Sequence, residues 1–230
     1  RPRMAARGLA DTLVDPALAF LRGHQADVRL HARLREMETD GDRVRRLRFA
    51  TGGESHVDLG DDDAVILAVP PSAAAAFQPG LQVPEESRAI VNAHFRLSQP
   101  VSTPGLIGLI GASAHWIFTR DDVASVTISA ADGLSLEGNE AIASRLWPEV
   151  RQALQLSETD LPPWRVIKEK RATFAQTPAE VRRRPGCITT LKNLFLAGDW
   201  TDTGLPATIE GSVRSGHTAA VRLFATATSA

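Results

Sequence analysis

Apolar and polar positions alternate over short stretches of this chain, a pattern that predicts many strands and few long helices. Near the start, Asp15 is expected to cap a short helix that Pro16 opens. Charged and apolar residues then alternate on both sides of Asp40-Gly41-Asp42, which predicts a β-hairpin. The apolar run from Ala64 to Val69, ended by two prolines, predicts a strand buried on both faces.

The middle of the chain predicts an antiparallel set of strands followed by one long helix. The expected strands cover residues 89–97, 106–110, 115–118, 123–130 and 164–172. Asn139 precedes an apolar stripe with helical spacing that includes Ile142, Leu146 and Val150, and Pro148 predicts a local distortion within it.

The stretch from Asn193 to Ala220 carries the most chemical information. A buried strand over 194–197 is followed by Gly198, which permits close approach of the backbone, and by Asp199 at the carboxyl end of the strand. Pro206 predicts the first turn of a helix whose free N–H groups point into a crevice. The helix is expected to pack inward through its apolar side chains, which are Ile209, Val213, Ala220, Leu223 and Phe224. On spacing alone, an ordinary strand–loop–helix crossover remains an equal alternative.

A short helix with an N-terminal cap is predicted after residue 177. Thr177 and Glu180 form a capping-box pattern with Pro178 at the first helical position. We interpret the arginines at 182–184 as solvated charges at the C-terminal end of that helix, rather than as a lipid or nucleic-acid site.

Composition narrows the classes of partner and compartment. The net charge of −1 over 230 residues gives no reason to expect nucleic-acid binding. The single cysteine, Cys187, rules out an internal disulfide and indicates a reducing compartment. No apolar run approaches the roughly 20 residues of a membrane span. We expect no metal site.

Several motifs together resemble the flavin amine oxidase and phytoene desaturase superfamily. The segment NLFLAGDWTDTGLPATIEGSVRSGHTAA resembles its C-terminal FAD-binding signature. VIKEKRATFAQTPAEVRRRPG, HWIFTR, VTISAADGL and LVDPALAFLRGHQADVRLHARLREMETDGDRV are most similar to the squalene-associated FAD-dependent desaturases, the hydroxysqualene dehydroxylases.

The resemblance implies an α/β (α+β overall) fold in which an antiparallel substrate domain is inserted into a partial Rossmann-like FAD-binding domain. The expected boundaries are 1–80 for the partial FAD-binding domain, 81–176 for the substrate-binding domain, and 177–230 for the return to the first. No G-x-G-x-x-G fingerprint is present, so we expect the chain to be the C-terminal part of a longer protein whose N-terminal half is a partner.

The resemblance also implies the site residues. The expected contacts to FAD are Gly198, Asp199, Ala207, Thr208, Ile209, Leu34 and Ala68. Thr208 stands where amine oxidases carry an aromatic wall, and the chain has no tyrosine, which favours an apolar isoprenoid over an amine. Trp116, Phe118 and Trp164 are the expected substrate contacts, with ordinary core aromatics as the alternative. The catalytic residues are unknown; the polar candidates are His94, His115, Asp199 and Glu210.

The implied function is FAD-dependent conversion of hydroxysqualene to squalene on the hopanoid route, in the cytoplasm and peripheral to the inner face of the membrane. The alternatives are a carotenoid or phytoene-type desaturase or another member of the flavin amine oxidase family. The alternatives without enzymatic activity are an inactive fragment or a module that binds an apolar ligand. We expect the isolated fragment to be inactive.

Overall fold

The computed structural model describes residues 5, 8–50, 53–101 and 105–227, which form two compact units. One unit combines Arg1–Val28 with Arg88–Ala172, and the other combines Arg29–Ser87 with Thr173–Ala230. Segments of the two units therefore alternate along the chain: the first, second, first and second unit follow one another. Residues 1–28 fall in a different unit from the rest of the predicted 1–80 segment, and the functional roles expected for the domains remain predictions.

The first unit is built on a five-stranded sheet with the order β6-β7-β8-β5-β9. Its strands are β5 (Ser87–Arg96), β6 (Leu106–Gly108), β7 (Trp116–Arg120), β8 (Val123–Ile128) and β9 (Trp164–Phe174). The β6–β7, β7–β8 and β8–β5 pairs are antiparallel. All five strands agree with the elements expected from alternation in the sequence.

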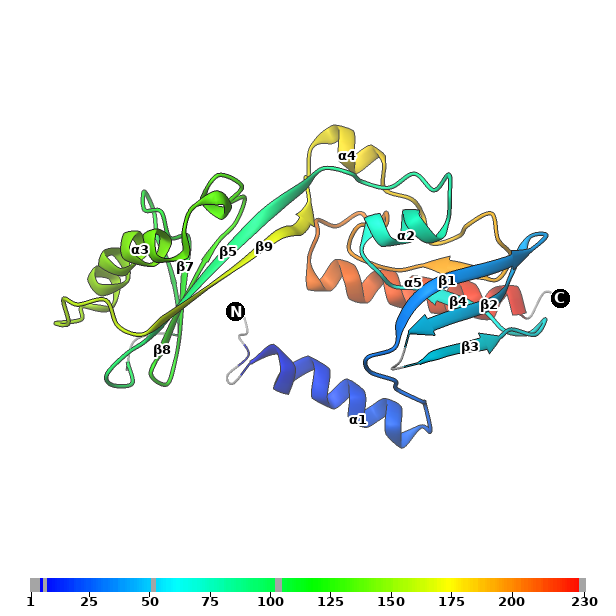
Figure 1. Ribbon diagram of the computed structural model, residues 1–230, viewed down its shortest axis with the longest axis horizontal. Helices are drawn as coiled ribbons and strands as arrows, with labels where there is room; N and C mark the ends of the chain where they lie inside the picture. Colours follow the sequence, from blue (N-terminus) through cyan, green and yellow to red (C-terminus); the bar gives the residue numbers. More distant parts are fainter. Residues whose placement is uncertain (1–4, 6–7, 51–52, 102–104, 228–230) are drawn as a thin grey trace. The chain divides into compact units, whose positions relative to one another are not determined.

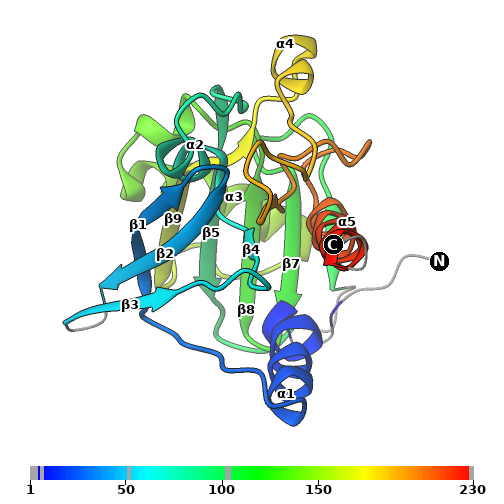
Figure 2. The same cartoon turned by 90° about the vertical axis from the view of Figure 1, so that its right-hand side faces the viewer.

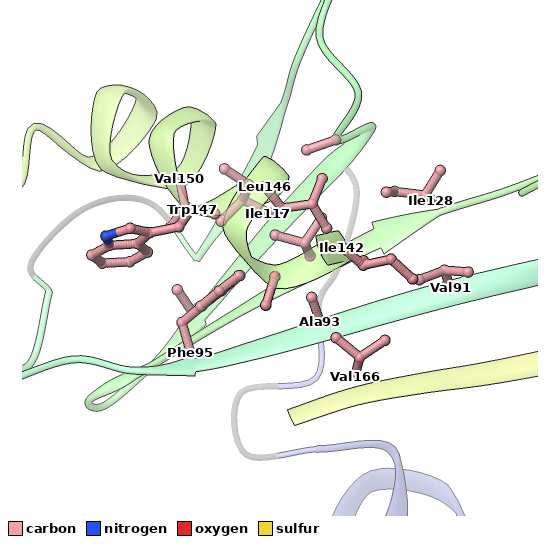
Figure 3. Packing of buried hydrophobic residues seen from close by; sticks show 14 of the residues in the cluster. Val91, Ala93, Phe95, Ile117, Ile128, Ile142, Leu146, Trp147, Val150 and Val166 are labelled. Carbon is pink, nitrogen blue, oxygen red and sulfur yellow. The ribbon is translucent and has the colours of Figure 1, made fainter. Parts of the chain in front are cut away.

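Helix α3 (Asn139–Leu154) covers one face of this sheet, because its apolar stripe matches the inward positions of the strands. Ile142, Leu146 and Val150 are fully buried against alternate residues of the sheet, including Val91 and Ile117 (Figure 3). Pro148 lies inside the helix, as expected. A short 3-10 turn, η2 (Leu134–Leu136), precedes α3.

Helix α1 (Asp15–Gly23) follows a π-helical turn, η1 (Ala10–Val14). Asp15 is therefore already helical, and the expectation that it caps the helix is wrong. Pro16 is the second residue of α1, and just before it the Asp15 N–H donates to the Ala10 carbonyl in the π-helical pattern. Leu13, Val14, Phe20 and Leu21 of these two elements are exposed, whereas Leu18 is partly buried.

The second unit contains a three-stranded antiparallel meander of β1 (Arg33–Asp40), β2 (Arg43–Ala50) and β3 (Glu54–Asp58), visible in Figure 2. Gly41, at a φ of +58°, makes the turn of the predicted hairpin. Arginines of β2 pair with acidic residues of the neighbouring strands, such as Arg46 with Asp58 and Arg48 with Glu38. These exposed pairs each contribute little to stability.

The same unit holds a two-stranded parallel sheet of β4 (Val65–Leu67) and β10 (Leu194–Leu196). Helix α2 (Pro71–Phe77) follows β4, and α4 (Pro178–Arg182) and α5 (Ile209–Ala227) complete the unit (Figure 1). Every residue of β10 is buried, as is typical of a continuous apolar run in a parallel sheet. The same prediction is wrong for β4, which buries Val65 and Leu67 but leaves Ile66 exposed.

The inward face of α5 differs from the predicted one. Its buried positions are Gly211, Ser215 and Ala219, spaced one turn apart, whereas Ile209 and Val213 are exposed. Small side chains let the helix lie close to β10, and the Ser215 Oγ accepts a hydrogen bond from the Gly198 N–H at 2.7 Å. The expectation that the large apolar residues pack inward is wrong for the described chain, except for the partly buried Leu223.

Candidate functional site

The predicted cofactor residues Ala68, Gly198 and Asp199 lie at one edge of the parallel sheet. Since β4 and β10 run in the same direction, their carboxyl ends meet there, and ligands of open α/β sheets bind at that edge. The Trp200 Nε1 donates to the Val69 carbonyl at 2.9 Å and so joins the segments that leave the two strands. Ala68 is exposed at this edge.

Gly198 turns the chain in a way that no other residue tolerates. Its φ is +146°, and a Cβ placed on it would lie 2.4 Å from the Trp200 Nε1. The Gly198 carbonyl accepts from both the N–H and the Oγ1 of Thr201, at 3.1 and 2.8 Å. The turn is thus packed against the Trp200 ring and held by hydrogen bonds to Thr201.

The side chain of Asp199 is half-buried beside this turn. Burial raises the pKa of its carboxyl above the usual 3.8, while its own N–H, the Arg184 guanidinium and the Trp200 N–H lower that pKa to a smaller extent. A carboxylate in this position gains from a donor that would compensate its desolvation, such as a ligand hydroxyl.

The N-terminus of α5 begins later than the sequence predicted. Thr208 is the capping residue, because its Oγ1 accepts from the Gly211 N–H at 3.1 Å, and Pro206 precedes the helix instead of opening it. Among the described residues, neither the Ile209 N–H nor the Glu210 N–H makes a hydrogen bond. Two backbone donors therefore remain for an anionic or electron-rich group.

The predicted Ala207 and Leu34 have different surroundings from this edge. Ala207 packs against the apolar core of the unit, and Leu34 is a partly buried residue of β1, in the other sheet. A cavity of about 480 Å³ opens beside β1 and the end of α2, where Met37 and Phe77 contribute to its lining. None of the predicted cofactor residues lines that cavity.

The three arginines at the end of α4 have three different environments. Arg182 is exposed, whereas Arg183 donates to the Val83 carbonyl at 3.0 Å and pairs with Glu85. Arg184 is half-buried against the loop that follows Asp199. The interpretation of all three as solvated charges holds for Arg182 alone.

The predicted cap of α4 is half formed. Thr177 accepts from the Glu180 N–H at 3.4 Å, as a capping box requires. The Glu180 carboxylate instead accepts from the Glu85 N–H at 2.7 Å, so it tethers the segment that leads into β5.

The predicted substrate aromatics divide between the two faces of the five-stranded sheet. Trp116 and Phe118 alternate with the buried Ile117 and so share the face away from α3. The Trp116 ring lies over Gly108, where an added Cβ would meet it at 3.0 Å. Trp164 instead packs against the core cluster beneath α3.

Polar residues line the same face as Trp116. The Nδ1 of His94 lies 2.9 Å from the Ser125 Oγ, and the Thr127 Oγ1 donates to the Asn92 Oδ1 at 2.7 Å. Burial, with a smaller effect of Arg165, lowers the pKa of His94 below 6.5 and favours its neutral form.

The two other polar candidates have local partners. The Nδ1 of His115 accepts from the Ser129 N–H at 3.3 Å, and Glu210 pairs with Arg214 at 2.8 Å one turn along α5. Both contacts are exposed and are of a kind common on protein surfaces, so neither indicates a catalytic role.

Comparison with known proteins identifies the chain's relatives. The model of the family described as flavin containing amine oxidoreductase matches residues 2–224. The chain is 51% identical over 220 residues to a hydroxysqualene dehydroxylase of Rhodopseudomonas palustris and 48% identical to one of Sinorhizobium fredii. Each alignment covers 96% of this chain and 52% of the relative, so the chain spans about half the length of these curated relatives.

A solved structure supports the fold. A geranylgeranyl bacteriochlorophyll reductase-like protein from Thermoplasma acidophilum superposes with a TM-score of 0.59 at 13% identity, covering 94% of this chain and 53% of that one. Among the described helices, none is both long and apolar enough to cross a membrane.

Proposed function

Because this chain belongs to the flavin-containing amine oxidoreductase family, we propose that it supplies the flavin-contacting carboxyl-terminal part of an enzyme that converts hydroxysqualene to squalene. The sequence identities of 51% and 48% to two hydroxysqualene dehydroxylases support hydroxysqualene as the substrate. The single structural observation that carries the proposal is the edge formed by the Gly198 turn, the Asp199 carboxylate and the two unpaired N–H groups of α5.

The donors and acceptors at this edge fit FAD. Gly198 lets the Trp200 indole pack directly against the turn, which fixes the position of the next residue, Asp199. Asp199 offers an acceptor to hydroxyl groups of the ribityl or ribose region. The Ile209 N–H, at the positive end of the α5 dipole, favours the electron-rich pyrimidine edge of the isoalloxazine. We assign Ala68 and Leu34 weaker contacts to the ribose and adenine, and Ala207 a packing role behind the helix start.

These assignments define separate roles for FAD and for the two units of the chain. FAD, when bound and reduced, would supply a hydride in place of the hydroxyl group, which takes a proton from solvent and leaves as water. The chain's own residues orient the ring and exclude water from it. We assign the unit with the parallel sheet to cofactor binding and the unit with the five-stranded sheet to substrate binding, where Trp116 and Phe118 offer an apolar surface. Trp164 has a structural role in the core beneath α3.

The proposed activity requires more than this chain. The relatives have about as many residues again outside the aligned part, so we propose that residues equivalent to their other half complete the FAD site. We also propose peripheral contact with a membrane surface, because a squalene-sized isoprenoid partitions into lipid. Exposed apolar residues such as Ile110 and Leu136 support such a contact.

The activity is tested with the product of the complete reading frame that encodes this chain. We expect the purified protein to carry FAD and, when reduced, to convert hydroxysqualene to squalene in liposomes. Benzylamine, oxidised under air, is the matched amine substrate. Oxidation of benzylamine with hydroxysqualene untouched would overturn the substrate assignment and leave the flavin assignment standing.

Asp199→Asn should have opposite effects on stability and on cofactor affinity. Burial raises the pKa of this carboxyl, so the folded protein without FAD is stabilised by the protonated form and loses that contribution as pH rises through the folded pKa. At pH 7 the uncharged amide should leave apo-protein stability equal or higher. FAD affinity should fall by about ten- to a hundredfold, since hydrogen bonds to charged groups contribute about 1.5–3 kcal/mol.

The pH dependence of FAD binding provides the control. Wild-type affinity should decline on acidification at a pH above that of an ordinary aspartate, and the Asn variant should lack this decline. Flavin fluorescence titration measures both proteins. Equal affinity in wild type and variant at pH 7 would show that Asp199 is only structural.

A further inference from the structure

The third arginine of the Arg182–Arg184 run is built into the loop that leads to α5. This loop covers residues 199–205, between the Gly198 turn and Pro206, and is called here the site loop. The Arg184 Nη1 donates to the Leu205 carbonyl at 2.8 Å. Its Nη2 lies 3.1 Å from the Asp199 carbonyl and 2.5 Å from the Thr201 carbonyl. One guanidinium therefore contacts the beginning, middle and end of the site loop.

The remaining contacts hold the guanidinium in place. Its Nη2 also lies 3.1 Å from the Thr203 Oγ1, and its Cζ lies 5.3 Å from the centroid of the Phe174 ring. The Nε is buried without an acceptor in the described chain. Next to it, the Pro185 carbonyl accepts from the Asp202 N–H at 2.8 Å, so consecutive residues hold the same loop.

This arrangement differs from that of a surface ion pair. Among the described residues, no carboxylate lies within ion-pair distance of Arg184, and its acceptors are neutral carbonyl and hydroxyl oxygens. A planar fork with several fixed donors matches such a set, whereas the single ammonium of lysine cannot reach all of these acceptors at once.

We propose that Arg184 is the positioning residue that holds the site loop in the conformation required for flavin binding. The inference rests on the proposed function, since it takes the Asp199 carboxylate and the Ile209 N–H as cofactor contacts. Arg184 acts through the backbone: the carbonyl of Asp199 is fixed at one end of the loop, and that of Leu205 is fixed four residues before the start of α5. One cofactor contact is the side chain of the fixed residue Asp199, and the other, the Ile209 N–H, follows the second fixed point by four residues.

The charge of Arg184 has a second consequence at the same place. A guanidinium held near Asp199 favours the carboxylate over the acid and so lowers the pKa that burial raises. Removal of the positive charge should therefore shift the pH decline of FAD binding toward neutral pH. A role limited to packing would leave this decline where it is.

The experiment compares Arg184→Gln and Arg184→Lys in the product of the complete reading frame. Arg182→Gln is the matched control, because Arg182 lies two residues away at the same helix end and is exposed. FAD affinity is measured by fluorescence titration across pH, and exchange of the site-loop amides is measured by mass spectrometry on the protein without FAD. Thermal unfolding of the same apo-protein reports stability.

We expect Arg184→Gln to weaken FAD binding at least tenfold and to speed amide exchange in the site loop. Its pH decline should move toward neutral. Arg184→Lys should restore the pH position but not the affinity, because it restores charge without the fork. Arg182→Gln should match wild type in all three measurements.

Two results would overturn the inference. One is FAD affinity in Arg184→Lys equal to wild type, which would make the fork geometry irrelevant. The other is unchanged site-loop exchange in both Arg184 variants. If Arg184→Gln fails to fold, the lysine variant still decides the question. Absence of FAD binding in the wild-type protein would instead contradict the proposed function itself.

Discussion

Replacing Gly198 with alanine should lower the free energy of unfolding by about 3 kcal/mol or more and should abolish retention of FAD. The new Cβ would lie 2.4 Å from the Nε1 and 2.7 Å from the Cδ1 of Trp200, at a φ of +146° that side chains rarely adopt. Backbone strain of this kind costs about 1–3 kcal/mol. Displacing a buried indole costs about as much again, since large aromatic losses from a core reach about 3–5 kcal/mol.

Trp200 cannot move aside without further loss. It is 2% exposed and donates to the Val69 carbonyl, so movement breaks the link between the two strand ends. Gly204→Ala is the matched control, because Gly204 has a φ of +70° in the same loop but no atom within 4 Å of an added Cβ. Strain alone should cost it about 1–2 kcal/mol.

Urea titration of both variants and of wild type measures the difference, with bound flavin recorded by absorbance after gel filtration. Equal losses of stability in Gly198→Ala and Gly204→Ala would contradict the steric account, because only the Cβ at position 198 would collide with Trp200.

Asn193→Asp should be of comparable effect on stability, with a loss of about 3–5 kcal/mol. The Asn193 side chain is 2% exposed, and its Oδ1 accepts from the Val44 N–H at 2.8 Å. Its Nδ2 donates to the Val44 carbonyl at 2.9 Å and to the Asp63 carbonyl at 3.2 Å. A carboxylate would face two carbonyl oxygens with no donor, and each buried group left unpaired costs about 1–3 kcal/mol.

The loss has structural consequences beyond one residue. Asn193 joins the meander, the entry to β4 and the start of β10, so its three bonds hold together segments far apart in the sequence. Lys192→Ala is the neighbouring control, since Lys192 forms an exposed ion pair with Asp42 and should change stability by less than about 1 kcal/mol.

The comparison is made by urea unfolding, followed by amide exchange at Val44 and in β10. Similar stability of the Asn193→Asp variant and wild type would mean that the three hydrogen bonds contribute nothing net, contrary to the account.

Local patterns of the sequence predicted the strands and the long helix of the five-stranded unit correctly. Alternation works there because one face of the sheet packs on α3 and the other does not, so burial and sequence share a period of two. The hairpin turn was predictable for a different reason: a glycine readily adopts the positive φ of +58° that this turn has at Gly41.

The start and the inward face of α5 were not predictable from local pattern. Pro206 is compatible with a first helical turn, but the Thr208 side chain captures the Gly211 N–H and starts the helix later. The face that packs is chosen by proximity to β10, which only small residues allow, and hydrophobicity alone therefore indicated the wrong stripe.

The roles of Asn193 and Arg184 depend on partners distant in the sequence. Nothing near Asn193 in the chain indicates Val44, and the run of three arginines looks uniform until the fold separates them. A buried amide or guanidinium is recognisable only when its acceptors are known. For this reason the candidate site residues could be proposed from motifs, while the residues that support them could not.

The central claim is that the Gly198 turn and the start of α5 hold the flavin. A crystal structure of the complete reading-frame product with FAD tests this directly. We predict the pyrimidine edge of the isoalloxazine at about 3 Å from the Ile209 nitrogen, and the Asp199 carboxylate on a cofactor hydroxyl. A flavin bound elsewhere, with the first turn of α5 and Asp199 facing only solvent, would contradict the account.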